Sequence, residues 1–208
     1  MRHFEEGSHS VYAMFLNNKG RVLFDTLIHK WDDEHSFMLE CDSKIISSLE
    51  KHLKVFKLRR KVSIEDVNKN YKLWAFITPS DTVFDENVNP KNEVNMFKDP
   101  RLNDLGYRLI SAPSLSEIHI ASTLGKDVTI DSEDGYKYLR YKLGVSEGSE
   151  DLPPGTSFPL EVNCDYLHGS LLNQIGGLLK RLKKLQRMNR TVQMHHSKDL
   201  NLCDRNGY

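Results

Sequence analysis

The sequence predicts an α+β fold in which helices pack against mostly antiparallel sheet layers. Two observations predict it: strand-like segments that follow one another through short connections, and an amphipathic helix placed among them. The first two segments form a predicted hairpin over residues 10–30, where an apolar stretch and an alternating stretch flank Asn17-Asn18-Lys19-Gly20. Asparagine and glycine tolerate the positive φ angles that such a turn needs.

The amphipathic helix follows a third predicted strand over residues 36–41. Asp42-Ser43 offers an N-cap, and Ile45, Leu49 and Leu53 follow at helical spacing with lysines on the opposite face. A helix of this kind buries one face, so we expect it to cover one side of the sheet.

The middle of the chain continues this alternation. Strands are predicted over residues 71–78 and 106–112, with a polar, Asn-rich loop over 81–100 between them. A further short strand is predicted over 118–121, and a second helix over 132–143, where a serine supplies the cap.

The charge pattern divides the chain near residue 169. The formal net charge is zero, yet residues 170–208 carry eight Lys/Arg against two Asp/Glu, which leaves residues 1–169 acidic by six charges. Leucines at helical spacing predict a basic helix to about residue 188, followed by disorder. Such a helix is typical of a membrane-surface or nucleic-acid patch, but no aromatic residue stands between Ser170 and Gly207 to stack on bases. We therefore expect no nucleic-acid partner.

Several classes of protein are excluded or disfavoured. Cys41, Cys164 and Cys203 are widely spaced, so neither a disulfide framework nor a metal site is expected. His195-His196 stands in a polar tail, and His119 on an apolar stretch is interpreted as half-buried rather than as a catalytic base. No apolar run is long enough for a transmembrane segment, and no signal or transit peptide is visible at the first residues.

A set of short segments, collinear over about residues 10–169, resembles one protein family. They are the hairpin YAMFLNNKGRVLFD (12–25), FMLECD (37–42), LRRKV (58–62), DPRL (99–102), LGYR (105–108), YLRYKLGVSEG (138–148), DLPPG (151–155), FPLEVN (158–163) and LHG (167–169). The chain is thus similar to the YgfZ-type folate-binding family, which is related to the glycine-cleavage T-protein. It resembles most the mitochondrial branch that serves iron–sulfur protein maturation.

The resemblance implies a T-protein-like fold around a cavity that fits tetrahydrofolate. It also implies a protein of the mitochondrial matrix whose partners are iron–sulfur assembly proteins and recipient apoproteins. Such a protein would be a maturation factor rather than a cluster carrier, because three scattered cysteines cannot hold a cluster.

Three residues become candidates for folate binding through this resemblance. Glu161 aligns with the segment in which T-proteins place a pterin-binding carboxylate, and one carboxylate can accept two adjacent N–H donors. Asn163 would share its face if the stretch is extended. Asp25 matches the second of the paired aspartates of T-proteins, and it is a weak catalytic candidate because Phe24 replaces the first. Arg108 is interpreted as structural, with contact to the folate glutamate as the alternative.

Two departures from the family pattern bear on activity. The first strand–helix unit of the family is not seen before the hairpin, and the Lys-Gly-Cys hallmark expected shortly after Gly169 is absent. We therefore expect residues 1–169 to be a partial folate-binding domain and 170–208 a divergent tail, with impaired activity. No catalytic residue is assigned, and a tetrahydrofolate-dependent aminomethyl or one-carbon transferase remains the alternative function.

Overall fold

The structure, a computed structural model, describes residues 9–31, 36–57, 62–78, 94–125, 128–172, 190–197 and 201–204. Its strands are β1 Ser10–Leu16, β2 Val22–Trp31, β3 Ser36–Asp42, β4 Val62–Asp66, β5 Lys72–Ile77, β6 Val94–Lys98, β7 Tyr107–Ser111, β8 Val128–Asp131, β9 Ser170–Leu172, β10 Arg190–Ser197 and β11 Asn201–Asp204. Its helices are α1 Ile46–Lys57, α2 Glu117–Leu124, α3 Glu133–Lys142 and α4 Gly148–Asp151, with 3₁₀ turns η1 Asn68–Asn70, η2 Asn103–Leu105 and η3 Pro159–Val162.

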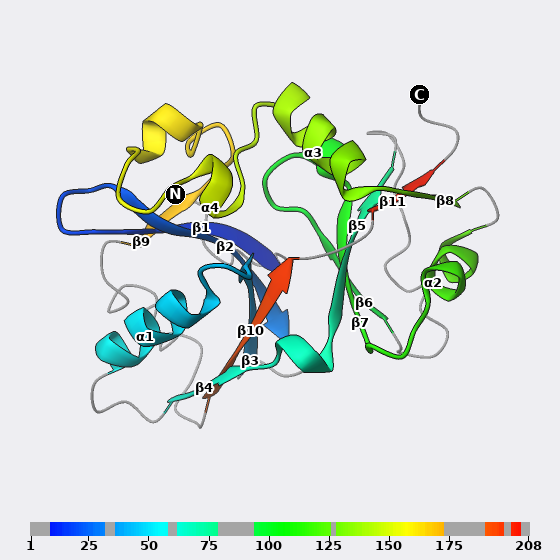
Figure 1. The fold of residues 1–208 in the computed structure, drawn as a ribbon, viewed down its shortest axis with the longest axis horizontal. Coiled ribbons are helices and arrows are strands. Elements are labelled where there is room, and N and C mark those ends of the chain that lie inside the picture. Colours follow the sequence, from blue (N-terminus) through cyan, green and yellow to red (C-terminus); the bar gives the residue numbers. More distant parts are fainter. Residues whose placement is uncertain are drawn as a thin grey trace.

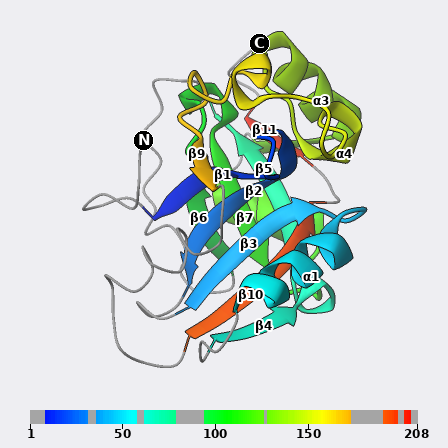
Figure 2. The same cartoon turned by 90° about the vertical axis from the view of Figure 1, so that its left-hand side faces the viewer.

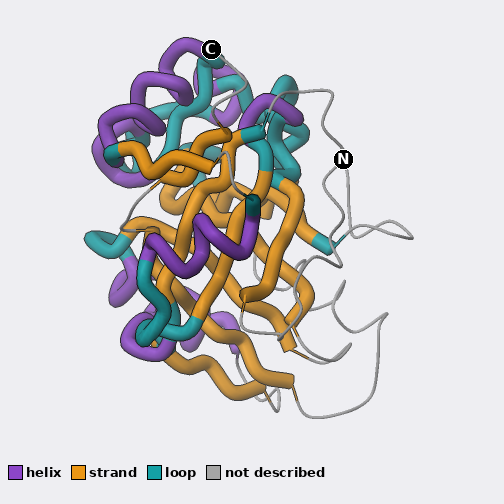
Figure 3. Tube along the Cα trace, turned by 90° about the vertical axis from the view of Figure 1, so that its right-hand side faces the viewer, coloured by secondary structure: helices purple, strands orange, loops and turns teal. Residues whose placement is uncertain are grey.

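The strands form two sheets that face each other. The first sheet has the order β4-β10-β3-β2-β1-β9, and the second has the order β6-β7-β5-β11-β8. Helix α1 covers the first sheet, α2 lies beside the second, and α3 and α4 lie at one end (Figure 1). The turned view in Figure 2 places α1 in front of β3, β10 and β4. From the opposite side, Figure 3 shows strands crossing the centre of the molecule.

Both faces of the first sheet are buried, which explains the nearly continuous apolar character of its strands. On one face, side chains from β1, β2 and β3 pack against Leu49 and Leu53 of α1. On the other face, Tyr12 and Met14 pack against Ala75 of β5 and residues around α3. The core therefore continues from α1 through both sheets.

Most elements predicted within residues 10–169 are confirmed. The hairpin pairs β1 with β2 in antiparallel register, with Gly20 at a φ of 78° in the turn. The strand over 36–41, the helix after Asp42, the strands over 71–78 and 106–112, and the helix capped by Ser132 are all present. The α+β class is confirmed, and pairs formed within residues 9–169 are antiparallel.

Two local predictions were wrong, and a third depended on extended geometry that is not present. The predicted strand over 118–121 is part of helix α2, because Ser116 accepts a hydrogen bond from the His119 N–H and so begins a helix. The predicted loop over 81–100 ends in strand β6, which pairs with β7; residues 81–93 lie outside the described residues. The stretch around Glu161 is the 3₁₀ turn η3 rather than extended chain, since Pro159 at its start favours a helical turn.

The tail also differs from its prediction. The predicted helix from 170 to about 188 falls almost wholly outside the described residues, and its first three residues form β9 parallel to β1. Two segments of the predicted disordered part, β10 and β11, pair within the two sheets. Every parallel pair among the described strands includes β9, β10 or β11. Backbone pairing with open strand edges outweighs the weak local pattern of these residues.

Candidate functional site

A buried network of ion pairs lies where the two sheets meet α3 and α4. Arg101, which follows β6, pairs through Nη2 with Asp99 Oδ2 at 2.7 Å and through Nη1 with Glu147 Oε2 at 2.6 Å. The Arg101 backbone N–H also donates to Asp99 Oδ1 at 2.9 Å. The Asp-Pro-Arg segment is therefore a local unit that presents a guanidinium to Glu147 just before α4.

Arg108 supplies the second guanidinium from strand β7. Its Nη2 pairs with Glu40 on β3, its Nε donates to Glu40 Oε2 at 3.2 Å, and its Nη1 donates to the Tyr136 hydroxyl at 2.7 Å. The Tyr136 hydroxyl donates in turn to Glu147 Oε2 at 3.0 Å. Arg108 thus joins the two sheets to helix α3, which fits the structural interpretation made from the sequence.

A polar chain extends this network to the hairpin. Ser10 Oγ lies 2.7 Å from His29 Nδ1, and His29 Nε2 lies 3.5 Å from Glu40 Oε2. The order serine, histidine, carboxylate is that of a hydrolase triad. Here, however, Ser10 is buried within the sheet and Arg108 neutralises Glu40, so the chain connects strands rather than activating a nucleophile.

The arginines set the charge state of the buried acids. Burial raises the pKa of Glu40, but Arg108 and His29 outweigh it and hold that pKa well below its usual range. Burial likewise raises the pKa of Glu147, and Arg101, Arg108 and Arg140 outweigh it, so its pKa also lies below the usual range. Both carboxylates are therefore ionised at neutral pH.

The pKa of Asp25 is shifted in the opposite direction. It is buried on β2, and burial, followed by repulsion from Glu147, raises its pKa from 3.8 to about 6. The Gly148 N–H donates to its two oxygens at 3.3 and 3.2 Å. Next to it, Asp42 Oδ2 accepts from the Ser149 N–H at 2.8 Å and from its hydroxyl at 2.6 Å. Two aspartates of the first sheet thus hold the start of α4.

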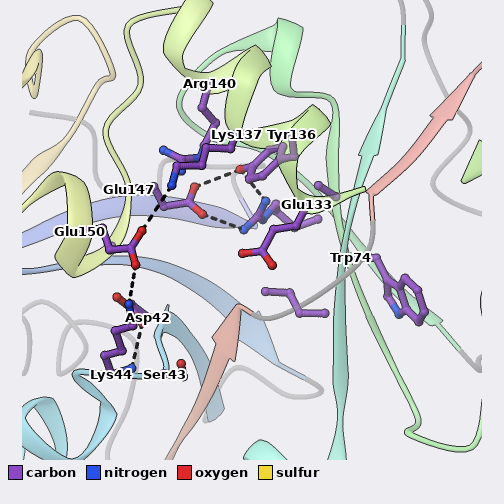
Figure 4. Close-up of a pocket in the computed structure, with 14 residues that line it drawn as sticks. Asp42, Ser43, Lys44, Trp74, Glu133, Tyr136, Lys137, Arg140, Glu147 and Glu150 are labelled. Atoms are coloured by element: carbon purple, nitrogen blue, oxygen red, sulfur yellow. Dashed lines mark hydrogen bonds and ion pairs between the residues drawn. The ribbon is translucent and has the colours of Figure 1, made fainter. Parts of the chain in front are cut away.

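A cleft of about 250 Å³ opens beside this network. Its walls come from the end of β3, from β5, from α3 and from α4, and Figure 4 shows Glu133, Tyr136 and Glu147 around the same space. It is lined by Asp42, Ser43, Lys44, Leu73, Trp74, Ala75, Arg108, Glu133, Tyr136, Lys137, Arg140, Glu147, Gly148 and Glu150. A second, water-sized cavity of about 10 Å³ shares Asp42 and Glu147 with the cleft and reaches Asp25 and Tyr12.

The structure separates the three residues predicted for folate binding. Asp25 lines the small cavity, whereas Glu161 and Asn163 line neither cavity. Glu161 is exposed, and its Oε2 accepts from the Phe158 N–H at 2.7 Å across η3. Asn163 is exposed in the left-handed region at a φ of 58°, and its side chain donates to the Gly144 carbonyl. The face that Glu161 and Asn163 would share in an extended strand does not form.

Two further predictions concern histidines. His119 is exposed on helix α2, not half-buried as predicted, because the helix turns its side chain away from the core that Ile120 enters. The side chains of His195-His196 lie outside the described residues. Within the described part of the chain, no group of three or more His, Cys, Asp or Glu is arranged to hold a metal ion.

Apart from Arg108, which was interpreted as structural, sequence reasoning missed the residues that form the network. Glu40 and Arg108 are the buried charged residues of their largely apolar strands, and a charge at a buried strand position is the signal that could have paired them. Glu147 and Arg101 carry no such signal, because both stand in loops next to glycine or proline.

Fold and site together define an α+β protein with a polar, charge-paired cleft between two sheets. Comparison with known proteins finds named relatives of the chain. It is 33% identical over 174 residues to the mitochondrial iron–sulfur cluster assembly factor IBA57 of Mus musculus. This match covers 79% of the present chain and 46% of the mouse protein. It is 35% identical over 166 residues to the IBA57 of Homo sapiens, with 76% and 44% covered. The homologue of Mycosarcoma maydis is 33% identical over 168 residues.

These matches confirm the resemblance to the mitochondrial iron–sulfur branch, and the chain is a relative of the IBA57 assembly factors. The chain spans less than half the length of these relatives. No family model matches it. The relatives are mitochondrial by name, in agreement with the predicted location, and none of the described helices is long and apolar enough to cross a membrane.

Proposed function

We propose that this chain assists the maturation of iron–sulfur proteins in the mitochondrial matrix, with assembly proteins and recipient apoproteins as its partners. The observation that carries the proposal is the collinear match to three IBA57 factors at 33–35% identity. The match includes the segments that fix the network, since Arg101, Arg108 and Glu147 all lie in stretches that carried the resemblance.

The proposal includes tetrahydrofolate as the ligand and a T-protein-like arrangement of the two sheets. The chemistry of the cleft supports tetrahydrofolate as the ligand. A folate carries adjacent N–H donors at one end and carboxylates at the other, and the cleft offers buried carboxylate acceptors and exposed lysines. Asp25, Glu161 and Asn163 are the residues that the family resemblance assigns to folate, and each has an oxygen that can accept a donor.

A complementation experiment tests the maturation role. Mammalian cells depleted of their IBA57 would receive this chain with a matrix-targeting leader, and the activities of mitochondrial iron–sulfur enzymes would be measured. We expect partial restoration, below that given by full-length mouse IBA57, because the chain matches less than half of that protein. If the expressed, soluble chain restores no more activity than an empty vector, the maturation role is wrong.

Binding of the ligand is tested separately on the purified chain. Titration calorimetry with tetrahydrofolate under anaerobic conditions would compare the wild type with Glu161→Gln, Asn163→Ala and Asp25→Asn. Binding that at least one of these variants weakens supports folate as the ligand. Transfer of a one-carbon unit to the bound folate would instead favour the transferase alternative, and absence of any binding would refute the folate part of the proposal.

A further inference from the structure

Strand β10 lies between two strands that come earlier in the chain and are joined by α1. It pairs in parallel with β3 over residues 36–42 and with β4 over residues 62–66. The two walls therefore run parallel to each other, with one strand position between them, which Figure 2 shows filled by β10. We call this position between β3 and β4 the strand slot. Its walls form a strand–helix–strand unit that an extended segment from elsewhere completes.

The face of the strand slot toward α1 is apolar. Phe37 and Leu39 of β3 and Val62 of β4 are buried there in the core formed with α1. Paired residues of neighbouring strands lie on the same face of a sheet. Positions 192 and 194, in register with Phe37 and Leu39, therefore fall on the α1 face, and they are occupied by Val192 and Met194. The strand slot thus suits a segment with apolar residues at alternate positions, and the tail supplies one.

Strand β11 fills a comparable position in the second sheet, between β5 and β8. Both tail strands end beside the cleft. Ser197, the last residue of β10, is in register with Asp42, and Asn201, the first residue of β11, is in register with Ala75. Asp42 and Ala75 line the cleft. Whichever copy of the chain supplies β10 and β11 therefore supplies backbone next to two walls of the cleft.

The connection that precedes β10 is long enough to serve more than one acceptor. Residues 173–189 join β9, at one edge of the first sheet, to β10, which lies four strand spacings away. Four spacings of ~4.8 Å amount to ~20 Å, whereas these residues span at most ~60 Å when extended at ~3.3–3.6 Å each. The same reach extends to the strand slot of a neighbouring copy.

We propose that β10 and β11 are exchanged between two copies of this chain, so that each copy fills the strand slot and the β5–β8 position of the other. The occupant is a second copy because the tail of this chain has the register and apolar spacing that fit the walls, and an identical chain offers the same segment. Each copy both donates and accepts, so the assembly closes as a dimer. Each cleft is then completed at Asp42 and Ala75 by backbone of the partner copy.

Disulfide trapping between positions in register tests the exchange. One full-length chain would carry Ser63→Cys on β4 and a second would carry Thr191→Cys on β10, because these positions are paired. Strands ~4.8 Å apart bring Cα atoms within the ~4.4–6.8 Å that a disulfide spans. Both chains would carry Cys203→Ser, and Cys41 and Cys164 are buried. After mixing, unfolding in urea, joint refolding and oxidation, we expect a disulfide-linked pair of the two different chains and a dimer mass in light scattering.

Two further chains make the trapping specific. Lys51→Cys, on the exposed face of α1, replaces Ser63→Cys in the control and should trap no mixed pair. Val192→Asp places a charge on the apolar face of the strand slot and should lower the dimer fraction roughly tenfold or more, because an unpaired buried charge is costly. The trapping variants replace a serine and a threonine, so they decide the question even if Val192→Asp does not fold.

Three results would overturn the inference. The first is a mixture that yields no more crosslinked pair than the Lys51→Cys control. The second is a chain with both Ser63→Cys and Thr191→Cys that is crosslinked only within itself, because β10 then fills the strand slot of its own chain. The third is a folded Val192→Asp chain with the dimer fraction of the wild type, because the copies would then associate through another surface.

Discussion

The two faces of the first sheet are built from the same strands but are stabilised in opposite ways. On the face toward α1, Ile28 of β2 lies opposite Leu39 of β3 within an apolar core. On the face toward the second sheet, Leu27 lies opposite Glu40, which binds Arg108. A shift of one residue along each strand therefore separates a hydrophobic core from a buried ion network.

The two faces of the first sheet differ in how they contribute to stability and to the shape of the cleft. The apolar face gains free energy from each buried side chain and tolerates similar replacements. The charged face is favourable only while every ion keeps its partner, because a single unpaired charge in the interior is costly. The cleft opens on the charged face, so its shape depends on partners supplied by both sheets and by α3.

The largest expected effect comes from breaking the network. Arg108→Met leaves Glu40 buried without its guanidinium, and we expect ~3–5 kcal/mol of destabilisation, measured by urea unfolding. Adding Glu40→Leu should recover much of the loss, because no unpaired charge then remains. Lys51→Met, on the exposed face of α1, is the control and should change stability little. A single Arg108→Met variant as stable as the wild type would contradict the network's role.

The apolar face should respond in proportion to the cavity that a substitution creates. Leu49 of α1 is fully buried against the first sheet, and Leu49→Ala should cost ~2–5 kcal/mol. Val55 on the same helix is exposed, so Val55→Ala should stay within ~0.5 kcal/mol. Unlike the Arg108 loss, the Leu49 loss should not be recovered by any single change on a partner strand. Equal effects at positions 49 and 55 would show that α1 is not docked as described.

The contrast also explains what the sequence could predict. Apolar periodicity identified the hairpin, the strands on either side of α1 and the helix itself, because these elements bury side chains in regular patterns. The hydrogen bond from His119 N–H to Ser116 decided α2 in favour of a helix, although the apolar run there fits either element. The resemblance led to the IBA57 relatives through short collinear segments.

The site could not be predicted in the same way. Arg101 and Glu147 are separated by 46 positions, and only the packing of both sheets against α3 brings them together. The charged side chains of β3 and β7 become partners only through the facing of the sheets, which no local pattern encodes. The tail strands β10 and β11 were missed because their places are set by strand edges elsewhere in the chain.

Replacing the buried carboxyl group of Asp25 should alter the pH dependence of stability. The folded pKa of Asp25, about 6, lies above its unfolded value, so the folded protein binds more protons between about pH 4 and pH 6. Ionisation of Asp25 therefore lowers stability as the pH rises through this range. Asp25→Asn should be more stable than the wild type above pH 6, by at most about 3 kcal/mol since one pKa unit is ~1.4 kcal/mol. The gap should close toward pH 4.

Thermal unfolding of both proteins across this range measures the difference directly. Asp165→Asn, at an exposed position, is the matched control and should follow the wild-type curve. Parallel curves for Asp25→Asn and the wild type between pH 4 and pH 6 would show that Asp25 does not titrate with folding.

The smallest expected effect lies on the apolar face, where His52 of α1 contacts the rings of Phe15, Phe24 and Phe56. Burial lowers the pKa of His52, so the folded protein binds fewer protons than the unfolded chain. The sign is opposite to that of Asp25: stability is lost as the pH falls below ~6.5, the unfolded pKa of histidine. His52→Phe should remove this loss while keeping the aromatic contacts. If the variant and the wild type lose stability equally between pH 7 and pH 5, acid sensitivity belongs to the charged face alone.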